Sequence, residues 1–89
     1  MNWFKIETDK GKDGAYNYIG SSSDSLAVVV KKVHDGEFVQ LANLVYMDRG
    51  EIKKWGDWDK KIVPTILINP KYVISVMQFK GDPKKKTKE

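Results

Sequence analysis

The chain has 89 residues, of which 40% are hydrophobic and 31% charged, a balance that supports one small folded domain and leaves no material for a second core. It contains no cysteine, which excludes disulfides, thiolate nucleophiles and cysteine-ligated metal centres. The formal net charge is +4, and residues 80–89 carry +3 of it, with five lysines against two carboxylates. We therefore expect a single β domain over residues 1–80 and a disordered, basic tail over residues 81–89.

The N-terminal segment shows no basic stretch followed by an apolar run, and no stretch approaches the length needed to cross a membrane. We expect a soluble, cytoplasmic protein with no membrane partner. A domain of this size gains little net stability from its own core, so pairing with copies of itself is a further expectation.

The start of the chain predicts a β-hairpin. Residues 3–8 alternate apolar and charged side chains, and residues 15–19 place two tyrosines on one side. Residues 9–14 hold two glycines and two aspartates, the residue types that tolerate turn geometry. The Gly- and Ser-rich residues 20–25 are expected to end the second strand.

Residues 24–34 are the ambiguous part of the chain. Their apolar side chains have helical spacing behind Ser23 or Asp24 as an N-cap, which predicts a short helix. Three consecutive valines argue against it, as does the Asp35-Gly36 pair, the favoured centre of a two-residue hairpin turn. We favour the hairpin and keep one short helix as the alternative.

The rest of the chain predicts further strands separated by turns. In chain order these are a central strand at 38–47, a turn at 48–51, an irregular connection at 52–61, a strand at 65–68, a bend at 69–70 and a last strand at 72–79. The last strand has apolar side chains on both faces, so we expect both faces to be covered. Five to seven short strands predict a mainly β fold: a small SH3-like, Sm-like or OB-like barrel, or a strongly curved antiparallel sheet.

The sequence carries no enzyme signature. His34 is the only histidine, and it adjoins a predicted turn. Asp57 and Asp59 form a close pair of carboxylates without a partner base or metal-loop spacing. The glycines of residues 11–14 lack the spacing of a phosphate-binding loop. We therefore expect no catalytic activity, no cofactor and no metal.

Residues 53–61, which we call the Lys/Trp segment, are the strongest candidate for binding, because two indoles three residues apart lie between paired lysines. The candidate binding residues are Lys53, Lys54, Trp55, Asp57, Trp58, Lys60 and Lys61, and the tail adds the electrostatic set Lys84, Lys85 and Lys86. Aromatic faces beside cations bind single-stranded nucleic acid. Tryptophans equally anchor protein contacts or close the open end of a barrel.

The tyrosines are a second candidate set. Tyr16, Tyr18, Tyr46 and Tyr72 lie on predicted strands, where they would form a stacking platform if they shared one sheet face. The simpler interpretation is that strands favour tyrosine.

Two function hypotheses follow. The first is a non-catalytic binding or regulatory module that acts through a protein partner or its own oligomer, with strand edges at 3–8 or 72–79 pairing with another chain. The alternative is binding of RNA or single-stranded DNA through the Lys/Trp segment and the basic tail. The location of the tail distinguishes the two hypotheses, because the positive charges of the tail and of the Lys/Trp segment add only if both lie on one face.

Overall fold

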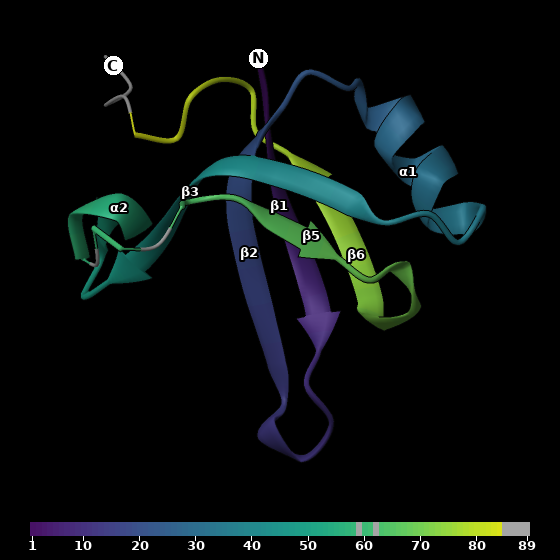
Figure 1. Cartoon of the computed structure of the whole chain (residues 1–89), viewed down its shortest axis with the longest axis horizontal. Coiled ribbons are helices and arrows are strands. Elements are labelled where there is room, and N and C mark those ends of the chain that lie inside the picture. The colour runs from purple at the N-terminus through teal and green to yellow at the C-terminus, as the bar shows by residue number, and fades with distance from the viewer. Residues whose placement is uncertain (59, 62, 85–89) are drawn as a thin grey trace.

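The computed structural model describes residues 1–58, 60–61 and 63–84, and the side chains of residues 57 and 58 lie outside that description. The chain is mainly β, as predicted (Figure 1). Its elements are β1 (Asn2–Asp9), the 3-10 turn η1 (Gly11–Asp13), β2 (Ala15–Ser22), α1 (Leu26–His34), β3 (Val39–Asp48), β4 (Glu51–Lys54), α2 (Trp55–Trp58), β5 (Ile66–Ile68), the 3-10 turn η2 (Pro70–Tyr72) and β6 (Val73–Gln78).

The strands form one antiparallel sheet in the order β4-β3-β2-β1-β6, with β5 also paired to β3. β4 pairs with residues 45–48 of β3, whereas β5 pairs with residues 39–41. Between these two parts of β3, Asn43 adopts a φ of 51°, and the register with β2 shifts. No described strand joins β5 to β6, so the sheet is open, which agrees with the second of the two predicted architectures, a curved antiparallel sheet.

The β1–β2 hairpin confirms the alternation seen in the sequence, but β2 does not end at Gly20. It continues to Ser22, which pairs with Asn2. The Ser21 side chain is buried, donates to the Ala42 carbonyl at 3.3 Å, and accepts from the Asn43 amide at 2.8 Å. Hydrogen bonding to β3 therefore offsets the weak strand preference of this polar segment.

A helix replaces the favoured hairpin at residues 24–34, so that prediction is wrong and its alternative is right. Ser25, and not the predicted Ser23 or Asp24, caps the helix: its side-chain oxygen accepts from the Val28 backbone amide at 3.3 Å. At the other end Gly36, with a φ of 76°, donates to the Val33 carbonyl, and Glu37 donates to the Lys32 carbonyl at 2.8 Å. This is the Schellman arrangement, so the Asp35-Gly36 pair ends a helix instead of joining two strands.

The predicted irregular connection at 52–61 contains regular structure. Arg49 and Gly50 have φ angles of 53° and 82°, which makes the predicted turn a two-residue hairpin loop that leads into β4. A single helical turn, α2, follows at once. β4 was not predicted because its sequence, EIKK, is largely charged, which is common in edge strands.

β6 confirms the predicted last strand but not its predicted covering. It is the end strand of the sheet, and Ile74 and Met77 are each 55% exposed. The bend before it is confirmed: Asn69 Oδ1 accepts from the Lys71 amide at 3.0 Å, and Pro70 begins η2.

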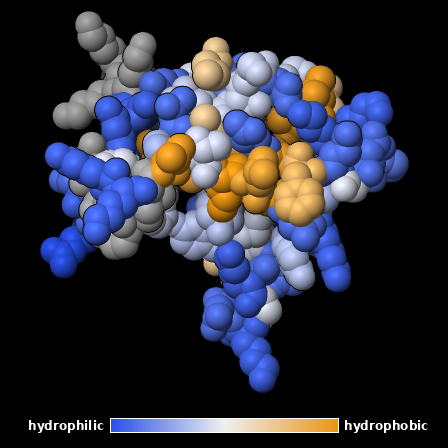
Figure 2. Space-filling model, in the orientation of Figure 1, coloured by the Kyte–Doolittle hydropathy of each residue, from blue (hydrophilic) through white to orange (hydrophobic). Residues whose placement is uncertain are grey.

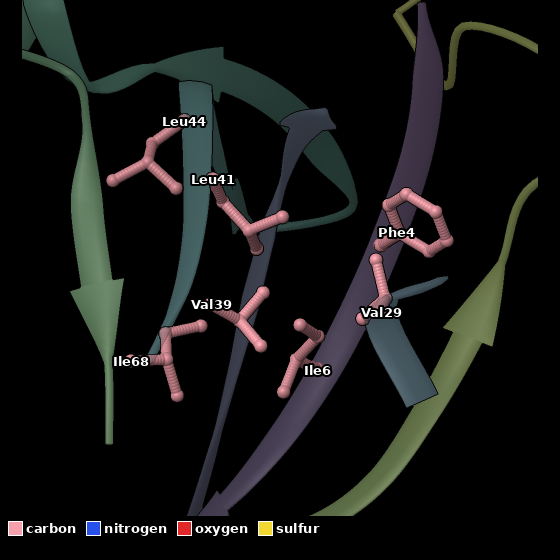
Figure 3. Close-up of a cluster of buried hydrophobic side chains, with 7 residues drawn as sticks. All are labelled: Phe4, Ile6, Val29, Val39, Leu41, Leu44 and Ile68. Carbon is pink, nitrogen blue, oxygen red and sulfur yellow. The ribbon is translucent and has the colours of Figure 1, made fainter. Parts of the chain in front are cut away.

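The main core fills the concave side of the sheet. Its buried members come from three strands, β1, β3 and β5, and from α1, which contributes one fully buried side chain, Val29 (Figure 3). They are Phe4, Ile6, Val29, Val39, Leu41, Leu44 and Ile68. Because side chains alternate along a strand, Trp3 points to the other side of β1 from Phe4. There it forms a smaller cluster with Ile19 and Val45.

The C-terminal residues return to this smaller cluster. Phe79 packs against it, and the Phe79 amide donates to the Trp3 carbonyl at 2.8 Å. Further along, the Lys84 ammonium lies 4.4 Å from the centre of the Trp3 ring. Lys84 of the sequence-defined tail thus lies against Trp3 of β1, and residues 85–89 are outside the described part of the chain. None of the described helices is long and apolar enough to cross a membrane.

Candidate functional site

The Lys/Trp segment is split between β4 and α2. Lys53 and Lys54 end β4, and Trp55 begins α2. Asp57 and Trp58 belong to α2, and their side chains are not described; Lys60 and Lys61 follow it. Lys85 and Lys86 lie outside the described residues.

Trp55 is half-buried and packs against the main core. Its ring centre lies 5.1 Å from that of Tyr46, with the two planes tilted by 52°. This placement favours the interpretation in which a tryptophan closes an open end of the sheet. Less of the Trp55 ring is therefore available to stack on a nucleic-acid base.

Lys54 and Lys84 nevertheless lie close together. They line one small hollow of about 150 Å³, together with Asn43, Leu44, Gly56 and Pro64. The tail and the Lys/Trp segment therefore share one side of the molecule.

The charges around this hollow are partly neutralised. Lys53 donates to Asp48 Oδ2 at 2.8 Å, and this carboxylate raises the pKa of the Lys53 ammonium. Lys84 lies 3.7 Å from Asp82 Oδ2. Among the described residues Lys54 has no carboxylate partner. The basic field at this hollow is thus weaker than the count of lysines indicates.

A larger hollow, which the sequence analysis did not identify, lies at the open gap of the sheet. Its volume is about 180 Å³, and the end of the β1–β2 hairpin, β5 and η2 surround it. The lining residues are Thr8, Asp9, Lys10, Tyr18, Ile66, Leu67, Ile68, Asn69 and Tyr72. We call it the tyrosine hollow.

Three of the four tyrosines gather at the tyrosine hollow. Tyr18 and Tyr72 line it, although they are far apart in the sequence. Tyr16 contacts Tyr18 edge-on, with ring centres 4.8 Å apart and planes at 63°. Tyr46 lies elsewhere, against Trp55. Tyr16 and Tyr18 thus lie on one face of a strand, β2, as predicted, whereas Tyr72 lies in the turn η2 and not on a strand.

Two lysines stand beside these rings. Lys10 donates to the Tyr18 hydroxyl at 2.9 Å, and this hydrogen bond raises the pKa of the Lys10 ammonium. Lys71 lies 5.8 Å from the centre of the Tyr72 ring. The Asp9 carboxylate accepts from the Gly11 amide at 2.7 Å, so it is engaged within the hairpin loop. Lys10 therefore lies in the lining of the tyrosine hollow, and the Lys71 ammonium lies beside the ring of Tyr72, which also lines it.

Exposed apolar surface continues from the hollow across β5. Leu67 is 62% exposed and pairs with Gln40, whereas its neighbours Ile66 and Ile68 face the core. Phe38, just before β3, is 54% exposed. Figure 2 shows hydrophobic side chains gathered on this front face, above the protruding hairpin. The signal in the sequence was the ILI run of β5, in which alternation turns the middle residue outward.

In the described part of the chain no group of three His, Asp or Glu side chains is placed to hold a metal ion. Every buried side-chain polar atom described has a hydrogen-bond partner. The absence of catalysis stays a prediction.

Comparison with known proteins gives no relative for this chain: no family model, no curated protein and no solved structure matches it.

Proposed function

We propose that this chain is a non-catalytic binding module that takes an extended segment of a protein partner into the tyrosine hollow, alongside β5. The observation that carries this proposal is the meeting of Tyr18, Tyr72 and the exposed Leu67 around one hollow. Tyrosine is enriched among the residues that anchor protein interfaces.

The size of the hollow supports a side chain as its occupant. Sites for cofactors and drug-sized ligands have volumes of roughly 300 to 1,000 Å³. The tyrosine hollow, at about 180 Å³, is smaller than that. It suits one bulky apolar side chain, with the rest of the partner lying on the surface outside.

The position of β5 favours an extended conformation for that segment. Among the described strands β5 pairs with β3 alone, so its second edge has no strand partner. An extended peptide gains main-chain hydrogen bonds at such an edge and specificity from pockets for alternate side chains. Lys10 in the lining and Lys71 beside Tyr72 favour Asp or Glu next to the anchoring residue.

A random-peptide display library selected on the full-length chain tests this proposal. We expect the selected peptides to share one bulky apolar residue flanked by Asp or Glu. Calorimetry should then show that Tyr72→Ala weakens binding about tenfold or more, the effect of losing an interface anchor. Met47→Ala is the control, because Met47 is exposed on β3 and does not line the hollow. Selections that yield no shared pattern, or peptides that bind Tyr72→Ala as well as wild type, would contradict the proposal.

A second candidate function is binding of single-stranded RNA or DNA at the Lys54–Lys84 hollow. The observation that favours it is that the tail and the Lys/Trp segment lie together, the condition for their charges to add. Trp3, beneath Lys84, gives this site an optical reporter.

Titration with labelled mixed-sequence single-stranded oligonucleotides at low and physiological salt tests the second candidate. We expect a Lys54→Ala/Lys84→Ala variant to lose affinity and to reduce the slope of log affinity against log salt by about 1.4, which corresponds to two phosphate contacts on a single strand. Lys12→Ala, a change on the distant hairpin turn, is the control. Absence of binding at low salt rules this candidate out.

A further inference from the structure

We propose that two copies of this chain pair through their β6 strands, antiparallel, about a two-fold axis that passes through Val76. The two sheets then form one continuous sheet across the axis. The surface is separate from the tyrosine hollow, so this inference is independent of the proposed function.

The edges of the sheet differ in how well they are protected against strand pairing. Natural proteins protect edge strands by keeping them short or by placing charges and proline on them. β4 carries three charges in four residues, and β5 has only three residues. β6 has six residues, VISVMQ, without a charge or a proline, and ends the sheet. Among the described strands, β6 is thus the longest free edge that carries neither a charge nor a proline.

The backbone register restricts the axis to residues whose backbone groups face the free edge, and Val76 is the one of these nearest the middle of β6. The Phe79 amide donates to Trp3 in β1, so the alternate residues Met77 and Ser75 also turn their backbone groups toward β1. Val76 and Gln78 turn theirs toward the free edge. An axis at Val76 therefore lets the two Val76 residues exchange a pair of backbone hydrogen bonds.

Side-chain direction is compatible with this axis. Residues opposite each other in a sheet point to the same face. Ser75 pairs with Glu7 and Met77 pairs with Lys5, so both lie on the convex face, whereas Val76 pairs with the buried Ile6. An axis at Val76 places Ser75 of one copy opposite Met77 of the other. No charged residue of β6 meets its own copy, so electrostatic repulsion does not oppose the pairing.

The interface also includes α1. A stable interface involves roughly 20 to 30 residues a side, more than one strand supplies. α1 contacts β6 and lies beside it (Figure 1). Leu26 and Val30, one helical turn apart, are 37% and 48% exposed. Pairing of the two β6 strands brings the two α1 helices toward each other, and these side chains supply the additional apolar contact.

Sedimentation velocity of the full-length chain over a wide concentration range tests the pairing. We expect a reversible monomer–dimer equilibrium that Met77→Lys shifts to at least tenfold higher concentration, because it places two charges at the interface. Met47→Lys is the matched control: Met47 has the same residue type and the same 55% exposure, but it lies on β3. Circular dichroism establishes that both variants fold. A single-chain mass at every concentration, or equal effects of the two variants, would overturn the inference.

Cross-linking tests the register directly, because the chain has no cysteine of its own. Val76→Cys puts two thiols on directly opposed residues with Cα atoms about 5.5 Å apart, within disulfide range. We expect a covalent dimer under mild oxidation from Val76→Cys and little from Met77→Cys, whose two copies are not opposed. The reverse pattern would refute the axis at Val76.

Discussion

Gly20→Ala is the substitution that most directly tests the curvature of the sheet. Gly20 lies opposite Phe4 in the hairpin and close to residues 41–44 of β3. A Cβ atom at Gly20 would lie 2.8 Å from the Ala42 carbonyl oxygen and 3.0 Å from Leu41 Cβ and Leu44 Cδ2. The nearest of these atoms belongs to the backbone and cannot turn aside.

The expected change in the free energy of unfolding follows from two opposing effects. Overpacking a close contact costs about 1 to 3 kcal/mol. Replacing glycine lowers the entropy of the unfolded chain and returns about 0.4 to 1 kcal/mol. We expect a net loss of about 1 to 2 kcal/mol in the free energy of unfolding, which lowers Tm by about 4 to 16 °C in a domain of this size.

Urea denaturation followed by circular dichroism measures this loss, with Gly56→Ala as the control. A Cβ at Gly56 meets no atom within 4 Å, and Gly56 lies in α2, where alanine is favoured over glycine. The control variant should be as stable as wild type or slightly more so. If Gly20→Ala is also as stable as wild type, β3 does not approach β2 as closely as this curvature requires.

Three further predictions concern the core and the C-terminal end of α1. Leu41→Ala removes a fully buried side chain and should cost about 2 to 5 kcal/mol in urea denaturation; a cost below 1 kcal/mol would place Leu41 outside the core. Gly36→Ala should destabilise by about 1 to 2 kcal/mol, and Gly36→Asn by less, because the left-handed φ of 76° suits asparagine better; equal costs would contradict the Schellman cap. Lys31 lowers the pKa of Asp35 below its usual 3.8, so this carboxylate stabilises the fold above that pH and the effect disappears as pH falls through the lowered value. An NMR titration of Asp35 in wild type and Lys31→Ala measures it, and an unchanged midpoint would count against the ion pair.

The sequence predicted those elements whose signals are local. Alternation and turn residues identified the β1–β2 hairpin, because the two strands and their loop are contiguous. The Asp35-Gly36 pair led to the wrong prediction of a hairpin, because a type I′ turn and a Schellman cap both require a residue with positive φ. The spacing of Val29 and Val33 behind Ser25 held the deciding information, since both side chains contact the core.

The site was harder to predict because it depends on pairing between distant residues. Tyr18 and Tyr72 meet only because β6 pairs with β1, with Val73 opposite Thr8. Nothing near either tyrosine in the sequence indicates that pairing. The predicted binding segment around Trp55 stands out by its composition of tryptophans and lysines, but the structure places the Trp55 indole partly in the core.

The long strand β3 has a consequence for how this chain tolerates change. β4 and β5 pair with its two halves, so the chain makes an excursion that leaves this strand after Lys54 and returns to it at Ile66. The Leu44 amide donates to the Pro64 carbonyl at 3.0 Å, and the returning chain is thereby fixed just before β5. Because lengthening a loop adds little entropy cost once its ends are held, this excursion is the natural point for accepting inserted sequence. A peptide tag or a small domain grafted there would leave the hydrogen-bonding pattern of β3 unchanged.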